Sequence, residues 1–217
     1  MSLQKKLIIT GLLAGACNTA IASGFALSGK STSGLGTALS GTTVLADDAS
    51  VVYNNPAAMR DLQGDYYTAQ LHIINTDIQF DDQGSNITGN GSQSIKKNHF
   101  VPNLYYVTTL NQDVSFGLGI YSPMGLGIEY DEDWVGRYLS TDSSLRTINI
   151  SPAFAFTPND KFNLGVGVDF QYAEAELNKA IDFDTICTGS GIAGCTDGSN
   201  KLSGDSWAVG YSLGLTY

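Results

Sequence analysis

The stretch KFNLGVGVDFQYA, residues 161–173, alternates strictly between two kinds of residue. Its even positions, from Phe162 to Tyr172, are all large and apolar, whereas its odd positions are mostly small and uncharged. Successive side chains of a β-strand point to opposite faces, so one face of this segment is wholly apolar. From Asn163 to Ala173 the other face carries none of the Lys and Glu residues of a sheet exposed to water. The stretch therefore predicts a β-strand between an apolar medium and a lumen.

Five further segments have the same character. Residues 114–121, 147–157 and 206–217 alternate in the same way, while residues 66–80 and 98–109 are rich in Tyr, Ile, Val and Phe but alternate less cleanly. We count six strands and expect an all-β fold. After residue 22, no stretch approaches the 18 or so consecutive apolar residues of a transmembrane helix.

The connections distinguish a membrane barrel from a secreted soluble β-sandwich, which alternation alone also fits. Short turns at residues 110–113 and 158–161 alternate with long polar links at 81–97, 123–145 and 180–204. Outer-membrane barrels have short periplasmic turns and long external loops, with aromatic girdles near the strand ends. Here eight aromatic residues lie near the predicted strand ends: Tyr66, Tyr67, Tyr105, Tyr106, Tyr121, Tyr172, Trp207 and Tyr217. We predict a transmembrane antiparallel β-barrel in contact with outer-membrane lipid.

Closure of such a barrel needs more than six strands. The smallest single-chain barrels have eight, and an open edge in lipid leaves unpaired backbone groups. We therefore expect either a fragment or an assembly of several copies.

The first 22 residues read as a cleaved secretory signal. Lys5 and Lys6 precede an apolar run, and Ala20-Ile21-Ala22 provides a cleavage site, which makes Ser23 the first mature residue. Lipidation at Cys17 is the alternative. Cleavage changes the net charge from −10 to −12, which argues against a nucleic-acid partner. In an exported chain the remaining Cys187 and Cys195 predict a local disulfide, with two free thiols as the alternative.

Between signal and strands lies a segment, residues 24–59, that is rich in Gly, Ser, Thr and Ala. Such a segment buries too little apolar surface to offset its ordering entropy, so it needs a container. We predict a plug in the barrel lumen. The domains are then a signal at 1–22, a hatch at 23–62 and six strands at 63–217.

No catalytic or metal-binding constellation is visible. His72 and His99 lie in different strands without further ligands, and Glu174 and Glu176 share a strand face with nothing to position a substrate. The acidic runs at 81–82 and 131–133 fit either a divalent cation or solvated loop charge. We expect no enzyme, no cofactor and no metal.

Several short motifs resemble those of the long-chain fatty acid transporters of Gram-negative outer membranes (FadL-type) and their relatives for aromatic hydrocarbons. They are Gly24-Phe25, Ser33-Gly34-Leu35-Gly36, Ala46-Asp47-Asp48-Ala49, Asn55-Pro56-Ala57, Phe116-Gly117-Leu118-Gly119, Gly125-Leu126 and Gly204-Asp205-Ser206-Trp207. The resemblance implies the first six strands of a fourteen-stranded barrel with a lumenal hatch, monomeric if full length. It also implies lateral release of ligand at a kinked third strand.

Site residues follow from the same resemblance. Asn55, Pro56 and Ala57 form a hatch motif near the kink, and Gly117 and Gly119 lie in the bending strand; small lumen-facing residues that make room are the other reading of both glycines. Phe25, Leu177 and Lys179 match the ligand pocket. Residues 177 and 179 share the odd positions of 163 and 171, so an unbulged strand points them into the lumen. Lys179 then pairs with a ligand carboxylate or is an ordinary loop lysine.

The expected function is passive uptake of hydrophobic compounds, most of all long-chain fatty acids. The alternatives are a surface barrel whose loops bind a partner or phage, and a truncated transporter without function.

Overall fold

The computed structural model describes residues 26–27, 29–159, 161–192 and 194–217. The predicted signal peptide, Cys17, the cleavage site before Ser23 and Phe25 lie outside these residues. Within them, no helix combines the length and the apolar character needed to cross a bilayer.

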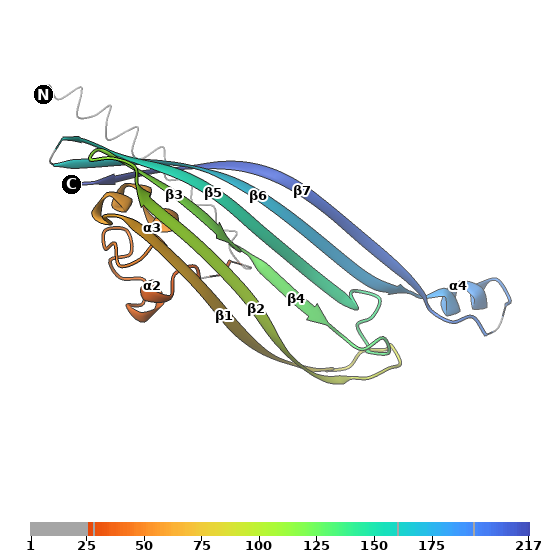
Figure 1. Ribbon diagram of the computed structural model, residues 1–217. Coiled ribbons are helices and arrows are strands. Elements are labelled where there is room, and N and C mark those ends of the chain that lie inside the picture. The colour runs from red at the N-terminus through yellow and green to blue at the C-terminus, as the bar shows by residue number, and fades with distance from the viewer. Residues whose placement is uncertain (1–25, 28, 160, 193) are drawn as a thin grey trace, which may run out of the picture.

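Seven antiparallel strands form one long, curved sheet (Figure 1). Their bounds are β1 Asp65–Asp81, β2 Ser92–Thr109, β3 Val114–Tyr121, β4 Gly125–Glu129, β5 Asp142–Asn159, β6 Phe162–Ile181 and β7 Gly198–Thr216. The order is β1-β2-β3-β5-β6-β7, with β4 paired to β5 alone. Within the described residues the sheet is open, and β1 and β7 are its edges. The all-β barrel wall predicted from the alternation is confirmed as part of a barrel.

The strand count of six is wrong by one. The additional strand, β4, lies inside the stretch 123–145 that was expected to be a polar loop, and it continues the line of β3 after a break. Several strands are also longer than their apolar alternation: β5 begins at Asp142 and β7 at Gly198. Apart from Leu145 and Leu202 these extensions are polar or glycine, as strands become once they leave the apolar layer for water.

Two faces of the sheet have the characters that the sequence pattern predicts. Phe162, Leu164 and Phe170 on β6 remain partly exposed on the outer face, whereas Gly165 and Gly167 between them are buried. β6 pairs with β7 in one unbroken register from Asn163 to Ile181. The odd positions of β6 therefore share one face along its whole length, and this is the face that the hatch covers.

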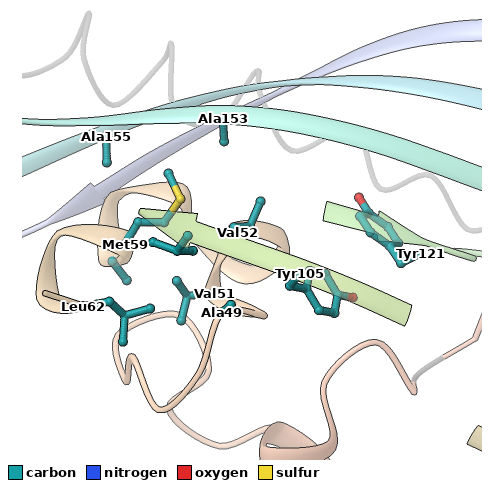
Figure 2. Packing of buried hydrophobic residues seen from close by; sticks show 11 residues of the cluster. Ala49, Val51, Val52, Met59, Leu62, Tyr105, Tyr121, Ala153 and Ala155 are labelled. Carbon is teal, nitrogen blue, oxygen red and sulfur yellow. The ribbon is translucent and has the colours of Figure 1, made fainter. Parts of the chain in front are cut away.

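Short helices form the hatch: α2 Thr32–Gly36, α3 Val51–Asn54 and the 3-10 helix η1 Pro56–Asp61. Its apolar side packs on the small residues of the lumenal face, where Val51, Val52 and Met59 meet Ala153 and Ala155 of β5 (Figure 2). Ala57, Ala58 and Met59 are fully buried there. The hatch thus packs branched and long side chains into the space that small residues of β5 leave, and Tyr105 and Tyr121 of the sheet complete the cluster.

The hatch and the C-terminal end of β7 lie at one end of the sheet, and the long connections lie at the other (Figure 1). The longest connection carries the fourth helix, α4 Phe183–Gly189. Short turns at the hatch end and long loops at the far end agree with the alternation of link lengths along the chain.

Candidate functional site: hatch, kinked strand and lumen

Asn55 joins the hatch to β7, an edge strand of the described sheet. Its side-chain oxygen accepts a hydrogen bond from the Ala57 backbone N–H (3.1 Å), which caps η1. Its amide nitrogen donates to the backbone carbonyls of Thr43 (2.7 Å) and Leu215 on β7 (3.3 Å). One amide therefore shapes the hatch and binds it to a strand 160 residues away.

Two glycines make the close approach of this motif possible. A Cβ atom on Gly165 of β6 would lie 2.2 Å from the Ala57 nitrogen, and one on Gly214 of β7 would lie 2.1 Å from the Asn55 oxygen. Any side chain at either position would displace the hatch. Asn55, Pro56 and Ala57 thus pack against β6 and β7. Other hatch residues contact the third strand, β3.

That contact is made at Gly117. A Cβ atom there would lie 2.3 Å from the Met59 sulfur and 2.6 Å from a methyl group of Val52, while one on Gly119 would touch the Tyr105 ring at 3.3 Å. The register of β3 with β5 is regular through both glycines. Both therefore make room on the lumenal face, and the ladder with β5 has no bulge at either glycine.

Arg60 is a second anchor, and our sequence analysis did not single it out. Its guanidinium donates to the hydroxyls of Thr157 (2.8 Å) and Ser115 (2.8 Å) and to the Gln112 carbonyl. It is the one cation within the predicted motif and its flanks at residues 55–62, directly after four buried residues. A lone cation directly after the apolar run Pro56 to Met59 was the available signal.

The break in the wall lies between Tyr121 and Gly125. Tyr121 pairs with Asn149 and Gly125 with Arg146, so three residues of this strand oppose two of β5. An extra residue of this kind bends a strand and interrupts its ladder, and Pro123 within it has no N–H to offer. β2 pairs with β3 only over Leu104–Thr109, and β4 pairs only with β5. In the described sheet, β2 and β4 therefore share no backbone ladder beyond the break, and an ion pair between Lys97 of β2 and Glu129 of β4 (3.2 Å) joins them through side chains.

Residues 26–27 and 29–30 of the hatch lie beside this break in the ladder. Ala26 forms a bridge with Met124, and the Leu27 N–H donates to the Pro123 carbonyl (3.0 Å). From β2, the Asn103 amide donates to the Gly29 carbonyl (2.8 Å) and the Tyr105 hydroxyl to the Lys30 carbonyl (2.7 Å). The hatch thus contacts both sides of the opening.

Farther from the hatch, a side chain rather than a backbone ladder lies between the two strands. A Cβ atom on Gly127 of β4 would lie 3.0 Å from the His99 ring of β2.

Leu177 and Lys179 lie near the outer end of β6, on the same face as Asn163 and Gln171, because the register with β7 is unbroken. Leu177 is half exposed, and Lys179 takes part in none of the ion pairs found among the described residues. Both side chains are therefore available on the lumenal face. Phe25, the third residue of the predicted pocket, lies outside the described residues.

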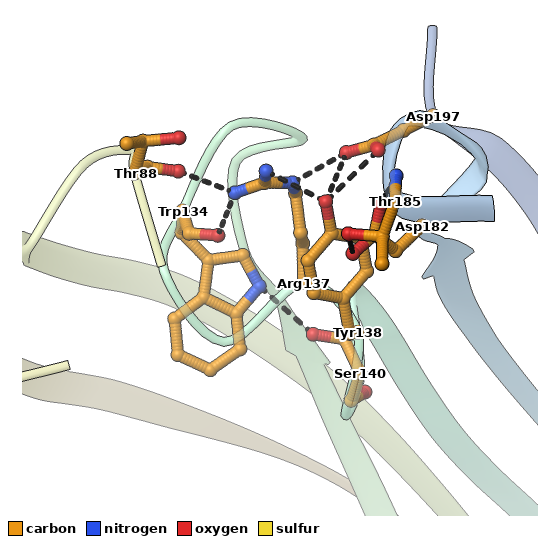
Figure 3. Close-up of polar contacts among 8 residues, drawn as sticks. All are labelled: Thr88, Trp134, Arg137, Tyr138, Ser140, Asp182, Thr185 and Asp197. Carbon is orange, nitrogen blue, oxygen red and sulfur yellow. Dashed lines mark hydrogen bonds and ion pairs between the residues drawn. The ribbon is translucent and has the colours of Figure 1, made fainter. Parts of the chain in front are cut away.

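The outer loops are joined through Arg137 (Figure 3). Its Nε pairs with Asp197 (2.6 Å), and its two other nitrogens donate to the Thr88 carbonyl (2.7 Å) and the Tyr138 hydroxyl (2.9 Å). Thr88, Arg137 and Asp197 belong to three different connections, so one guanidinium ties them together. Within the last of these connections, Cys187 and Cys195 form a disulfide.

Comparison with known proteins agrees with this architecture. The family described as "Outer membrane protein transport protein (OMPP1/FadL/TodX)" matches residues 13–217. A "Long-chain fatty acid transport protein" of Escherichia coli O6:H1 is 30% identical over 210 residues, which cover 89% of this chain and 47% of that protein. "Outer membrane protein P1" of Haemophilus influenzae is 32% identical over 197 residues, covering 81% and 41%. The chain thus spans about half the length of these relatives.

Solved structures show the same fold. The crystal structure of a Pseudomonas aeruginosa FadL homologue matches with a TM-score of 0.65 at 25% identity, covering 88% of this chain and 49% of that one. The Pseudomonas putida toluene transporter TodX matches with a TM-score of 0.54 at 22% identity, covering 78% and 47%. The resemblance predicted from the sequence motifs is confirmed: the chain belongs to the FadL and TodX family of outer-membrane transport proteins in Gram-negative bacteria.

Proposed function

We propose that this protein carries hydrophobic compounds passively across the outer membrane and releases them sideways between β2 and β4. The observation that supports this most directly is the absence of a backbone ladder between these strands beyond the break at residues 122–124. An unpaired strand edge in lipid costs several kcal/mol for each unsatisfied group, so a barrel wall is normally continuous. A wall in which side chains alone join one pair of strands, with a hatch segment beside it, suits an exit into the bilayer.

The hatch supports the same proposal. Residues 23–62 act as a plug that closes the lumen, and residues 63–217 form the wall. Leu27, Gly29 and Lys30 close the lateral opening through a few hydrogen bonds. Such bonds contribute only about 1 kcal/mol each, so a ligand that replaces their contacts can displace the segment. An apolar ligand that leaves through the wall avoids the water on the inner side.

Long-chain fatty acids are the leading ligand. The relative with that name is 30% identical, whereas the likeness to the toluene transporter, at 22%, bears on the fold alone. We assign Phe25, Leu177 and Lys179 to the ligand: the first two to the alkyl chain and the Lys179 ammonium to the carboxylate. Aromatic hydrocarbons are the alternative ligand class. We expect a monomer embedded in outer-membrane lipid.

The second candidate function is partner or phage binding by the outer loops. The observation that favours it is apolar exposure on ordered loops: Leu139, Ile186 and Ile192 are 85%, 57% and 58% exposed. Loss of loop-dependent adsorption without loss of fatty acid uptake would identify this function.

A reversible cross-link between β2 and β4 tests lateral release. We would introduce His99→Cys and Gly127→Cys into the gene that expresses the protein and treat cells with a short, cleavable thiol cross-linker. We expect uptake of a labelled long-chain fatty acid to fall at least severalfold and to recover when the linker is cleaved, while ligand still binds to the protein.

Each single cysteine variant with the cross-linker is the matched control, because it carries the same modification without joining the strands. Cells without the protein define background uptake. Full uptake by the cross-linked double variant would rule out lateral release here, and background uptake by unmodified wild-type cells would rule out transport itself.

A further inference from the structure

Side chains occupy the place of the missing ladder between β2 and β4. The Lys97 ammonium of β2 pairs with the Glu129 carboxylate of β4 (3.2 Å), and the His99 ring of β2 lies beside Gly127 of β4. A step of two residues along β2 thus corresponds to a step of two residues back along β4, as in an antiparallel pair. The two strands therefore stay in register past the break, although the described sheet has no backbone ladder between them.

The ion pair lies at the outer end of the lateral opening. β4 ends at Glu129, and residues 130–141 follow it as a loop on the outer side of the sheet. At the other end of the opening, the Leu27 N–H of the hatch donates to the Pro123 carbonyl (3.0 Å). The hatch thus closes the inner end of the opening, and the ion pair closes the outer end.

Three strands contribute charge around this pair. Glu129 lies directly opposite Asp142 of β5, so two carboxylates share one end of the ladder between β4 and β5. Like charges opposite each other on a sheet repel, and a nearby cation relieves the repulsion. Lys97 provides this cation from β2, while its neighbour Lys96 pairs with Asp77 of β1 (3.0 Å). The acidic end of β4 therefore attracts β2 across the opening.

The same pair is easy to break. The side chains of Lys97 and Glu129 are 47% and 68% exposed, and an exposed ion pair shifts an equilibrium by about fivefold at most. A backbone ladder over the same length would be far harder to open, since each group left unsatisfied in lipid is costly. A contact of this strength suits a joint that opens and closes.

We infer that Lys97 and Glu129 form a latch, an ion pair that holds β2 and β4 together at the outer end of the lateral opening. The inference rests on the proposed function, since a latch is needed only where ligand leaves through the wall. While the pair is joined, the opening stays narrow. Once it is released, β2 is held by β1 and β4 by β5, and the gap between β2 and β4 widens to admit an alkyl chain.

The distance between two spin labels tests the latch directly. The labels are attached to Asn98→Cys on β2 and to Ser144→Cys on β5, the partner strand of β4, in the protein extracted from outer membranes and returned to phospholipid vesicles. Cys187 and Cys195 are bonded to each other and take no label. With the latch intact we expect mainly one short distance. Lys97→Glu, which places a third carboxylate at the joint, should raise the population of longer distances at least threefold.

Further variants separate the charge of the side chains from their shape. Glu129→Lys should widen the gap as Lys97→Glu does, whereas the double variant that carries both changes restores opposite charges and should return to the original distances. Lys96→Glu is the matched control, because it reverses the charge of the neighbouring residue, whose partner Asp77 lies on β1, where the ladder with β2 is continuous. It should leave the distances unchanged.

Unchanged distances in Lys97→Glu, or a widened gap that the double variant keeps, would overturn the latch and leave the proposed transport intact. Uptake of labelled palmitate by cells is measured separately. Faster uptake in Lys97→Glu than in the wild type, at equal amounts of protein, supports the part of the latch in release, and equal uptake despite a widened gap overturns that part. Background uptake by wild-type cells would instead contradict the proposed function itself.

Discussion

At the scale of single residues, glycine decides where the hatch sits. Gly117, Gly165 and Gly214 lie on three different strands, and a Cβ atom on any of them would fall within 2.3 Å of a hatch atom. Gly204, on the same face of β7 as Gly214, has no atom within 4 Å of the corresponding position. The absence of a side chain therefore lets the hatch dock at Gly117, Gly165 and Gly214, whereas a Cβ atom at Gly204 would contact nothing.

Gly214→Ala should loosen the hatch. The added methyl group would meet the Asn55 oxygen, and overpacking of this kind destabilises by about 1–3 kcal/mol. We expect faster protease cleavage within residues 29–62 and a lower unfolding midpoint in denaturant. Gly204→Ala is the matched control and should match the wild type in both measurements; equal behaviour of the two variants would show that the hatch does not rest on Gly214.

At the scale of elements, the main irregularity of the wall is the break between β3 and β4. Thr147 of β5 holds the break in shape, because its hydroxyl accepts a hydrogen bond from the Met124 N–H (3.0 Å) and donates to the Met124 carbonyl (2.5 Å). These two bonds replace the ladder that the extra residue interrupts.

Thr147→Val removes both bonds at nearly constant volume and leaves the Met124 N–H without this partner, whereas the Met124 carbonyl keeps the hydrogen bond from the Ser122 hydroxyl (3.2 Å). The expected penalty is about 1–3 kcal/mol, felt locally. Amide hydrogen exchange at residues 122–126 should accelerate by about tenfold or more, while exchange in β6 stays unchanged. Thr108→Val, the same change in β2, serves as control, and protection at the break that survives Thr147→Val would mean that another group holds it.

The short helix α4 should respond to acid. Asp182 caps it by accepting hydrogen bonds from the Thr185 hydroxyl (2.6 Å) and N–H (2.8 Å), and these bonds lower the pKa of the Asp182 carboxyl. A lowered pKa in the folded state means that the cap stabilises α4 above about pH 4 and that this contribution is lost as the pH falls through the lower folded value.

We therefore expect exchange at residues 183–189, corrected for its intrinsic pH dependence, to rise below about pH 4. Asp182→Asn has no carboxyl to titrate and should show no such transition. A transition of the same size in that variant would assign it to another group.

At the scale of the whole molecule, the two ends of the sheet are held differently. At the inner end the hatch packs on glycine and alanine; at the outer end Arg137, whose side chain is 13% exposed, joins three connections through directed hydrogen bonds. The three bonds use separate nitrogens of one guanidinium, a geometry that an ammonium cannot reproduce.

Arg137→Lys should therefore release the three loop connections from one another rather than act as a conservative change. Protease cleavage within residues 82–91 and 182–197 is expected to accelerate severalfold. Lys96→Ala is the control. It breaks an ion pair exposed to water, whose loss costs at most about 1 kcal/mol of stability, so the loops should be cleaved at the wild-type rate. Wild-type protection in Arg137→Lys would show that the charge alone suffices.

How much of the structure the sequence predicts depends on how far apart in the chain the interacting residues lie. The strands, their two faces and the family could be predicted, because alternation and short motifs are local and the apolar layer imposes one pattern on every strand. β4 was missed because GLGIE is too short and too glycine-rich to read as a strand inside a polar stretch. The role of Arg60 was missed because its partners lie 52 to 97 residues away.

The sequence by itself determined that residues 162–172 turn their even positions outward and that residues 24–59 need a container. The physical reason is that each of these follows from the side chains of one segment and the medium around it. Only the tertiary structure decided that Asn55 rests on Gly214, that β2 and β4 share no backbone ladder and that Asp169 faces a pocket beside Tyr121. These depend on the register between strands far apart in the chain, and no local pattern encodes that register.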